Sequence, residues 1–200
     1  LKLRLYSYSS EDEPTLKLAG NAMADYKALL SVFSKDRVGL ISLVTGHLFD
    51  KGINLEDTSF AVLGKGGEFT SVIDIPTDLS EKALIDELHS LEGMESADID
   101  VRRFSFGDVD TPPTEVTHHI HCEGPDQPGV LARLSEVFID FDANIVRLKS
   151  DQIDQNGKKK FITRFSVYIP QARVSNCLAA LDNTASALGQ TLSAETAYEE

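Results

Sequence analysis

The sequence predicts an α+β protein of two ferredoxin-like βαββαβ domains in tandem, each a four-stranded antiparallel sheet with two helices on one face. Two observations predict this fold. The run Asp36-Arg37-Val38-Gly39-Leu40 is echoed by Asp126-Gln127-Pro128-Gly129-Val130, an offset of 90 that Asn54 and Asn144 keep. A period near 90 is too long for solenoid or propeller repeats and favours two similar domains. Within each repeat, the hydrophobic pattern also switches between the strand period and the helix period in the same order.

Each repeat opens with a short apolar strand and continues with an amphipathic helix. Residues 28–33 and 116–122 are rich in strand-forming residues, which indicates mostly buried strands. After each echoed run, apolar residues recur every three to four positions, which is typical of a helix with one buried face. The spacing places on these faces Leu40, Leu43, Val44 and Leu48 in the first repeat, and Leu131, Leu134, Phe138 and Phe141 in the second.

A hairpin, a second helix and a last strand complete each repeat. Strands 54–63 and 68–75 are expected to turn through 64–67, and strands 144–153 and 159–169 through 155–157, where Asn-Gly is a strong hairpin signal. The pairs Ile75-Pro76 and Ile169-Pro170 differ by 94, so the second repeat holds four extra residues, which we expect in a turn. The second helices are predicted from Leu84, Leu88 and Leu91 and from Val174, Leu178, Leu181, Ala185 and Leu188, and the last strands are 98–106 and 190–198.

Composition sets the expected domain boundaries. The polar, Pro-containing segment 108–113 is typical of a linker, so the first domain is expected at 23–107 and the second at 114–200. Residues 1–22 are acidic and mixed, without the cationic start and apolar run of a secretory signal. We expect them to be an N-terminal extension, or a cloning remnant before a native start at Met23.

The charge balance limits the classes of partner. Nineteen basic and 32 acidic side chains give a formal net charge of -13, so the averaged field repels phosphate backbones and anionic lipid. We therefore expect no direct nucleic-acid binding, and the longest nearly apolar stretch, 38–44, is too short to span a membrane. With only two cysteines there is no disulfide framework, which favours a reducing, cytoplasmic location.

The loop between the first strand and the first helix has the chemistry of a small-ligand site. The Asp that opens each echoed run, Asp36 or Asp126, is expected to cap the helix. A capping box would place Glu or Gln three residues on, but Gly stands there and leaves the first helical amides open to a carboxylate. Asn54 and Asn144 add an amide donor and acceptor, so the set matches an α-amino acid. The alternative is purely structural: Asp caps, Gly permits close packing and Asn ends a turn.

These residues resemble the ACT domain, a ferredoxin-like module that binds amino acids. The resemblance covers residues 26–200 and rests on the two echoed runs, followed by Gly52-Ile53-Asn54-Leu55 and by Ala143-Asn144-Ile145. The family often has Pro before the Gly, where the first repeat has Val38. Two such domains and nothing else resemble the layout of the glycine cleavage system transcriptional repressor group. The resemblance implies that ligand is bound by Asp36, Arg37, Val38, Gly39, Leu40 and Asn54, and by Asp126, Gln127, Pro128, Gly129, Val130 and Asn144.

The resemblance further implies a regulatory protein without enzymatic activity or a cofactor. It would bind a small amino acid, glycine or serine, and repress transcription in glycine cleavage control through a protein partner. Family ligands commonly lie between two paired ACT domains, which implies pairing within one chain or across a homodimer. The alternative from another class is a protein-interaction module whose ligand sites are vestigial.

Three rival functions find little support in the sequence. His119 and His121 share one face of a predicted strand, but two ligands do not make a zinc site, and no metal is expected. Cys122 has no base placed near it in the sequence, so we expect a buried small hydrophobe. An RNA recognition motif needs two aromatic residues where Phe161 is followed by Thr163. No P-loop, G-x-S-x-G elbow or dinucleotide fingerprint occurs, so we expect no catalytic residues.

Overall fold

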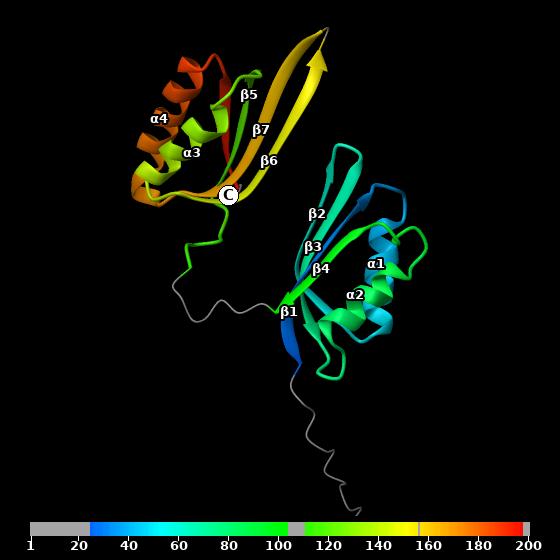
Figure 1. Cartoon of the computed structure of the whole chain (residues 1–200). Helices are drawn as coiled ribbons and strands as arrows, with labels where there is room; N and C mark the ends of the chain where they lie inside the picture. Colours follow the sequence, from blue (N-terminus) through cyan, green and yellow to red (C-terminus); the bar gives the residue numbers. More distant parts are fainter. Residues whose placement is uncertain (1–24, 104–110, 156, 198–200) are drawn as a thin grey trace, which may run out of the picture. The chain divides into compact units, whose positions relative to one another are not determined.

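The computed structural model describes residues 25–103, 111–155 and 157–197, which form two compact units divided after Asp108 (Figure 1). The predicted extension 1–22, the start of the linker, Asn156 of the second hairpin and the ends of both last strands lie outside the described residues.

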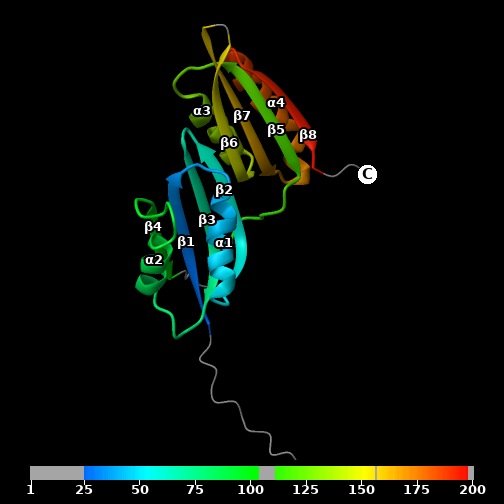
Figure 2. The same ribbon diagram turned by 90° about the vertical axis from the view of Figure 1, so that its right-hand side faces the viewer.

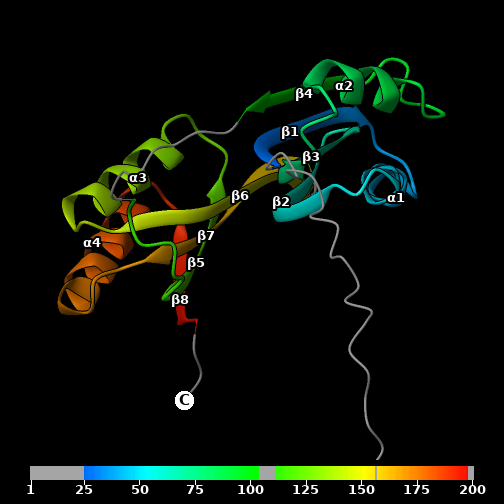
Figure 3. The ribbon, with the colours of Figure 1, turned by 90° about the horizontal axis from the view of Figure 1, so that it is seen from below.

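Both units have the βαββαβ order that the sequence predicts. Each sheet is antiparallel throughout, with order β2-β3-β1-β4 in the first domain and β6-β7-β5-β8 in the second. Figures 2 and 3 show both helices of each domain on one face of its sheet. The ferredoxin-like fold is therefore confirmed. The elements are β1 (Tyr26–Lys35), α1 (Leu40–Asp50), β2 (Asn54–Leu63), β3 (Gly66–Ile75), α2 (Glu81–His89), β4 (Asp98–Arg103), β5 (His118–Pro125), α3 (Val130–Asp140), β6 (Asn144–Gln155), β7 (Lys158–Tyr168), the 3-10 turn η1 (Gln171–Arg173), α4 (Val174–Ala187) and β8 (Thr191–Thr196).

The turn of the first hairpin is shorter than predicted. Leu63 pairs directly with Gly66, so the loop contains two residues and both Gly66 and Gly67 belong to β3. A Cβ on Gly66 would clash with the ring of Phe33, and one on Gly67 would lie 2.9 Å from Leu40. Glycine is needed at these two positions because the side chains of Phe33 and Leu40 occupy the space that a Cβ would take, and not because the chain turns there.

The four extra residues of the second repeat do not lie in a turn, so that prediction was wrong. Ile153 pairs with Lys160 as Leu63 pairs with Gly66, and two further pairs, Asp154 with Lys159 and Gln155 with Lys158, follow before the loop. The β6–β7 hairpin is thus longer by two residue pairs (Figure 1). A two-residue loop matches the strand twist, and adding residues in pairs keeps each side chain on its own face of the sheet.

Each domain has its own apolar core between sheet and helices. Of the four residues predicted on the buried face of α1, Leu40, Val44 and Leu48 are buried and Leu43 is partly buried against the core. The buried face of α2 includes Leu84 and Leu88. In the second domain the rings of Phe138 and Phe165 pack with centroids 5.3 Å apart. Phe141 and Leu188, predicted on helix faces, are instead the residues that follow α3 and α4.

Candidate functional site

The echoed loops form two equivalent helix starts, but their capping differs from the prediction. The residues before α1 and α3 are Gly39 and Gly129, with φ of 89° and 91°, and neither helix has a side-chain cap. Asp36 and Asp126 lie three residues earlier, and their backbone N–H groups donate to the carbonyls of Lys65 (2.9 Å) and Lys159 (3.3 Å). The predicted Asp caps were therefore wrong. A glycine in the left-handed conformation, which glycine alone adopts without strain, precedes each helix instead.

The space in front of both glycines is open. Apart from the glycine and its two neighbours in the chain, no heavy atom lies within 4 Å of the position that a Cβ would take on Gly39 or Gly129. The first turn of a helix leaves backbone N–H groups without intrahelical acceptors, and the helix dipole adds partial positive charge there. Val38 and Pro128 are exposed, whereas Leu40 and Val130 are buried and fix the helix start to the core. Because the glycine has no side chain, an anionic group can approach the backbone N–H groups of each loop directly.

The two repeats differ at Arg37 and Gln127, but both side chains form the same kind of hydrogen bond. The Arg37 guanidinium donates to the carbonyl of Glu92, and the Gln127 amide donates to that of Leu188. Each of these carbonyls precedes a glycine of positive φ in the connection between the second helix and the last strand. Both side chains are thus engaged in tying the loop to its own domain.

Asn54 and Asn144 do not lie beside the loops of their own domains. The end of β1 pairs with the start of β3, which also pairs with Leu63 at the end of β2, whereas Asn54 begins β2 opposite Asp74. The length of β2 is about 30 Å for ten residues at about 3.3 Å each. The same register holds for Asn144, whose Nδ2 donates to the carbonyl of Pro113 at 2.9 Å, leaving Oδ1 as an acceptor. A single domain therefore separates the two halves of the predicted site.

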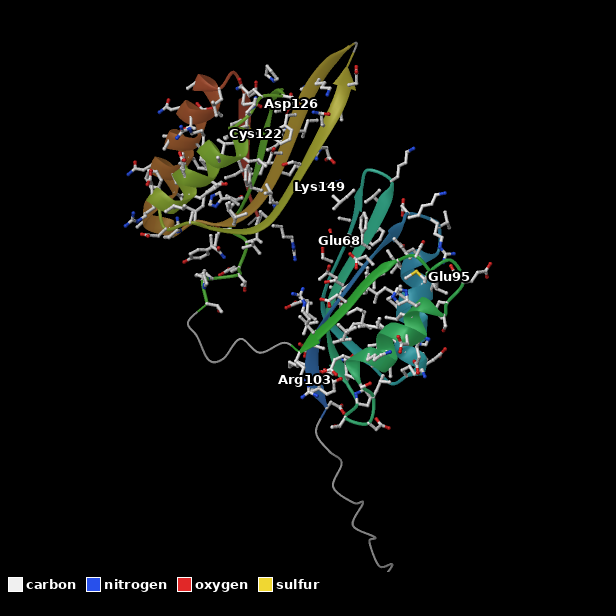
Figure 4. The ribbon with its side chains drawn as sticks, in the orientation of Figure 1. Glu68, Glu95, Arg103, Cys122, Asp126 and Lys149 are labelled. Carbon is white, nitrogen blue, oxygen red and sulfur yellow. The ribbon has the colours of Figure 1, made fainter. Side chains whose placement is uncertain are left out.

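The second loop also contacts the extended hairpin. Asp126 follows β5 beside β6–β7, and its carboxylate accepts a hydrogen bond from Gln152 (Figure 4).

The two cysteines of the second domain are buried, and Cys122 lies between the sheet and the helices (Figure 4). Burial raises the pKa of the Cys122 thiol and that of Cys177, the latter to about 11. Both cysteines are core residues, as predicted for Cys122.

His119 and His121 share the open face of the second sheet, as predicted. His119 Nδ1 lies 3.1 Å from Ser166 Oγ, and His121 Nε2 lies 3.4 Å from Glu123 Oε2. They border a shallow hollow of about 410 Å³ that Arg164 also lines. Within residues 25–103, 111–155 and 157–197, no group of three or more His, Cys, Asp or Glu is arranged to hold a metal ion.

One polar residue near the second loop was missed by the sequence analysis. Gln190 is 5% exposed, its Nε2 donates to the carbonyl of Pro125 at 2.8 Å, and its Oε1 is buried without a hydrogen-bond partner among the described residues. The only signal in the sequence is that Gln190 follows Gly189 as Met94 follows Gly93, so that a polar residue replaces an apolar one.

Comparisons with known proteins agree with this architecture. No family model matches the chain. Over 122 residues the chain is 25% identical to the glycine cleavage system transcriptional repressors of Escherichia coli K12 and Shigella flexneri, covering 61% of this chain and 63% of each repressor. The predicted resemblance to the repressor group is confirmed. The chain thus spans just under two thirds of the length of the curated relatives that it matches.

Two crystal structures share the tandem arrangement of elements. An unknown protein from Galdieria sulphuraria superposes with a TM-score of 0.66 and 22% identity, covering 87% of this chain and 99% of its own. A candidate glycine cleavage system transcriptional repressor superposes with a TM-score of 0.57 and 16% identity, covering 86% and 98%. At these identities the likeness establishes the fold alone. Among the described residues, no helix is long and apolar enough to cross a membrane.

Proposed function

We propose that the chain is an amino-acid-binding regulatory protein of the glycine cleavage repressor type, built from two ACT domains and acting through a protein partner. The observation that carries this proposal is the pair of open, glycine-started helices at Gly39 and Gly129. A helix start offers backbone donors and about half a positive elementary charge, which suits the carboxylate of glycine or serine. The similarity to the curated repressors supports a regulatory role.

The ligand site is proposed to be shared between two domains. Within one domain the glycine loop and the Asn at the start of β2 or β6 lie at opposite ends of a strand, as the register requires. A complete site therefore needs the loop of one domain beside the Asn of another, either in the same chain or in a second copy. The Asn Oδ1 would accept from the ligand's ammonium while the loop binds its carboxylate.

The signal is proposed to be a change in domain pairing. A ligand that bridges two domains binds the paired state more tightly, and it shifts the equilibrium only by that difference in affinity. The net charge of -13 disfavours direct contact with an operator, so a protein partner in the cytoplasm would read the change.

A panel of the twenty amino acids in a thermal-shift assay tests this function. At a hundredfold excess over Kd, a ligand adds about 2.7 kcal/mol to the stability of the chain and raises its unfolding temperature by several degrees. We expect glycine or serine to give this shift. If none of the twenty raises the unfolding temperature, the chain is a protein-interaction module with vestigial ligand sites.

A further inference from the structure

The second domain contains a buried amide that is only half satisfied, directly under its ligand loop. Gln190 precedes β8, and its side chain extends to the end of β5, where Nε2 donates to the carbonyl of Pro125. A Cβ on Gly124 would lie 2.6 Å from Oε1, so the amide lies against the glycine that precedes the loop. The amide is therefore directed at the start of the loop that continues to Gly129.

The orientation of this amide is fixed by its neighbour. Pro125 has a carbonyl acceptor and no N–H, so only the NH₂ group of Gln190 can face it. Oε1 is then the remaining polar atom of the amide: it lies against Gly124 and is buried without a hydrogen-bond partner among the residues that the structure describes. A buried acceptor without a donor destabilises the folded chain, so a molecule that donates a hydrogen bond to it, an ordered water or a ligand, gains binding energy there.

The first domain has no such acceptor at the equivalent position. Met94 follows Gly93 as Gln190 follows Gly189, and in both domains the carbonyl before that glycine accepts from the loop side chain. Met94 is fully buried in the apolar core. In strand register Gln190 corresponds to Ala97, the residue before β4, which is also buried and apolar. The residue opposite this position on the first strand differs too, since Ser34 stands where the second domain has Gly124. Of two otherwise equivalent loops, one is thus closed below by an apolar side chain and the other carries an unused acceptor.

We propose that the second domain is the one whose loop binds the amino acid, and that Gln190 Oε1 accepts a hydrogen bond from the ligand's ammonium group. This inference rests on the proposed function and names the domain and the residue that perform it. The amide is hydrogen-bonded to Pro125, the first of residues 125–129, which are all exposed, and in this proposal the ligand reaches Oε1 by displacing this loop. Gln190 is then a specificity residue, because a ligand without a donor leaves the acceptor unsatisfied.

Titration calorimetry on the full chain, with glycine, serine and acetate as probes, tests the proposal. Gln190→Met introduces the residue of the first domain, and Gly124→Ser places a Cβ against Oε1 and displaces the amide. We expect one glycine or serine bound per chain, an affinity lower by roughly tenfold or more in either variant, and unchanged weak binding of acetate. Met94→Gln, which places a glutamine after the corresponding glycine of the first domain, should leave the affinity unaltered.

The outcomes separate this inference from the function on which it rests. If the unmodified chain binds neither glycine nor serine, the proposed function fails and this assignment with it. If the unmodified chain binds but Gln190→Met or Gly124→Ser binds equally well, the Gln190 assignment alone is wrong.

Discussion

Gly39 precedes α1 and Gly46 lies inside it. Replacing Gly39 by alanine should lower the stability of the first domain, whereas replacing Gly46 by alanine should raise it. Gly39 has a φ of 89° and open space around a would-be Cβ, whereas Gly46 lies inside α1, is not among the glycines of positive φ and is equally unobstructed. Since a Cβ would clash at neither site, the change in unfolding free energy depends only on the backbone conformation. Gly39→Ala should destabilise the first domain by about 1–2 kcal/mol, because an L-residue is strained in the left-handed region.

Gly46→Ala should instead stabilise the same domain by roughly 0.5–1 kcal/mol, because alanine loses less backbone entropy in a helix. Gly39→Asn should lose less than Gly39→Ala, since Asn tolerates positive φ. Urea unfolding followed by circular dichroism measures the change in unfolding free energy for all three variants. In a thermal melt, each kcal/mol of this change corresponds to about 4–8 °C in the unfolding temperature of a domain of this size. If Gly39→Ala is as stable as the unmodified chain, the left-handed helix start is wrong.

Three further predictions concern the loop tie, the buried histidine and the cysteines. Arg37→Met should cost about 0.5–1.5 kcal/mol by losing the bond to the Glu92 carbonyl, whereas Arg37→Gln, which copies Gln127, should retain it in urea unfolding. Burial lowers the pKa of His118 from 6.5, so the unfolded state binds the proton more readily and stability falls as the pH drops below about 6.5. His118→Leu should flatten this dependence when urea midpoints at pH 7.5 and 5.5 are compared. The buried thiols of Cys122 and Cys177 should react with a thiol reagent at pH 8 only after unfolding, and rapid labelling of the native chain would contradict their burial.

The fold could be predicted because its signals are local and repeated. Leu40, Val44 and Leu48 recur at helical spacing, and the echo of residues 36–40 at 126–130 gives the same order of elements twice. Each copy supports the assignment of the other. The open-face position of His119 and His121 followed from the strand period in the same way.

What the sequence did not reveal depends on backbone angles and on distant partners. The Asp-x-x-Gly spacing favours Asp as the helix cap. The positive φ of Gly39 makes Gly39 the residue before the helix instead, and the hydrophobic periodicity contains no information about the sign of φ. The hairpin extension was misplaced because an insertion of four residues is compatible with a loop or with two more strand pairs. Gln190 was missed because its burial and its unused acceptor arise from contact with Pro125, 65 residues away.

The separation of Gly39 from Asn54 is the finding that most constrains the function. Family resemblance groups the two residues, while the strand register places them at opposite ends of β2. Pairing of domains is therefore a requirement of the proposed site and not an addition to it. Replacing the Asn that pairs with the Gly129 loop, Asn54 or Asn144, should accordingly weaken ligand binding and domain pairing together.

Backbone amide resonances of the isotopically labelled chain, followed while glycine or serine is added, test most directly whether a glycine-started helix receives the ligand. We expect the shifts to gather at residues 128–132, with smaller ones at the side-chain amide of an Asn that begins a β2-type strand. Shifts confined to His119, His121 and Arg164 on the open sheet face, or none at a millimolar excess of either amino acid, would contradict it.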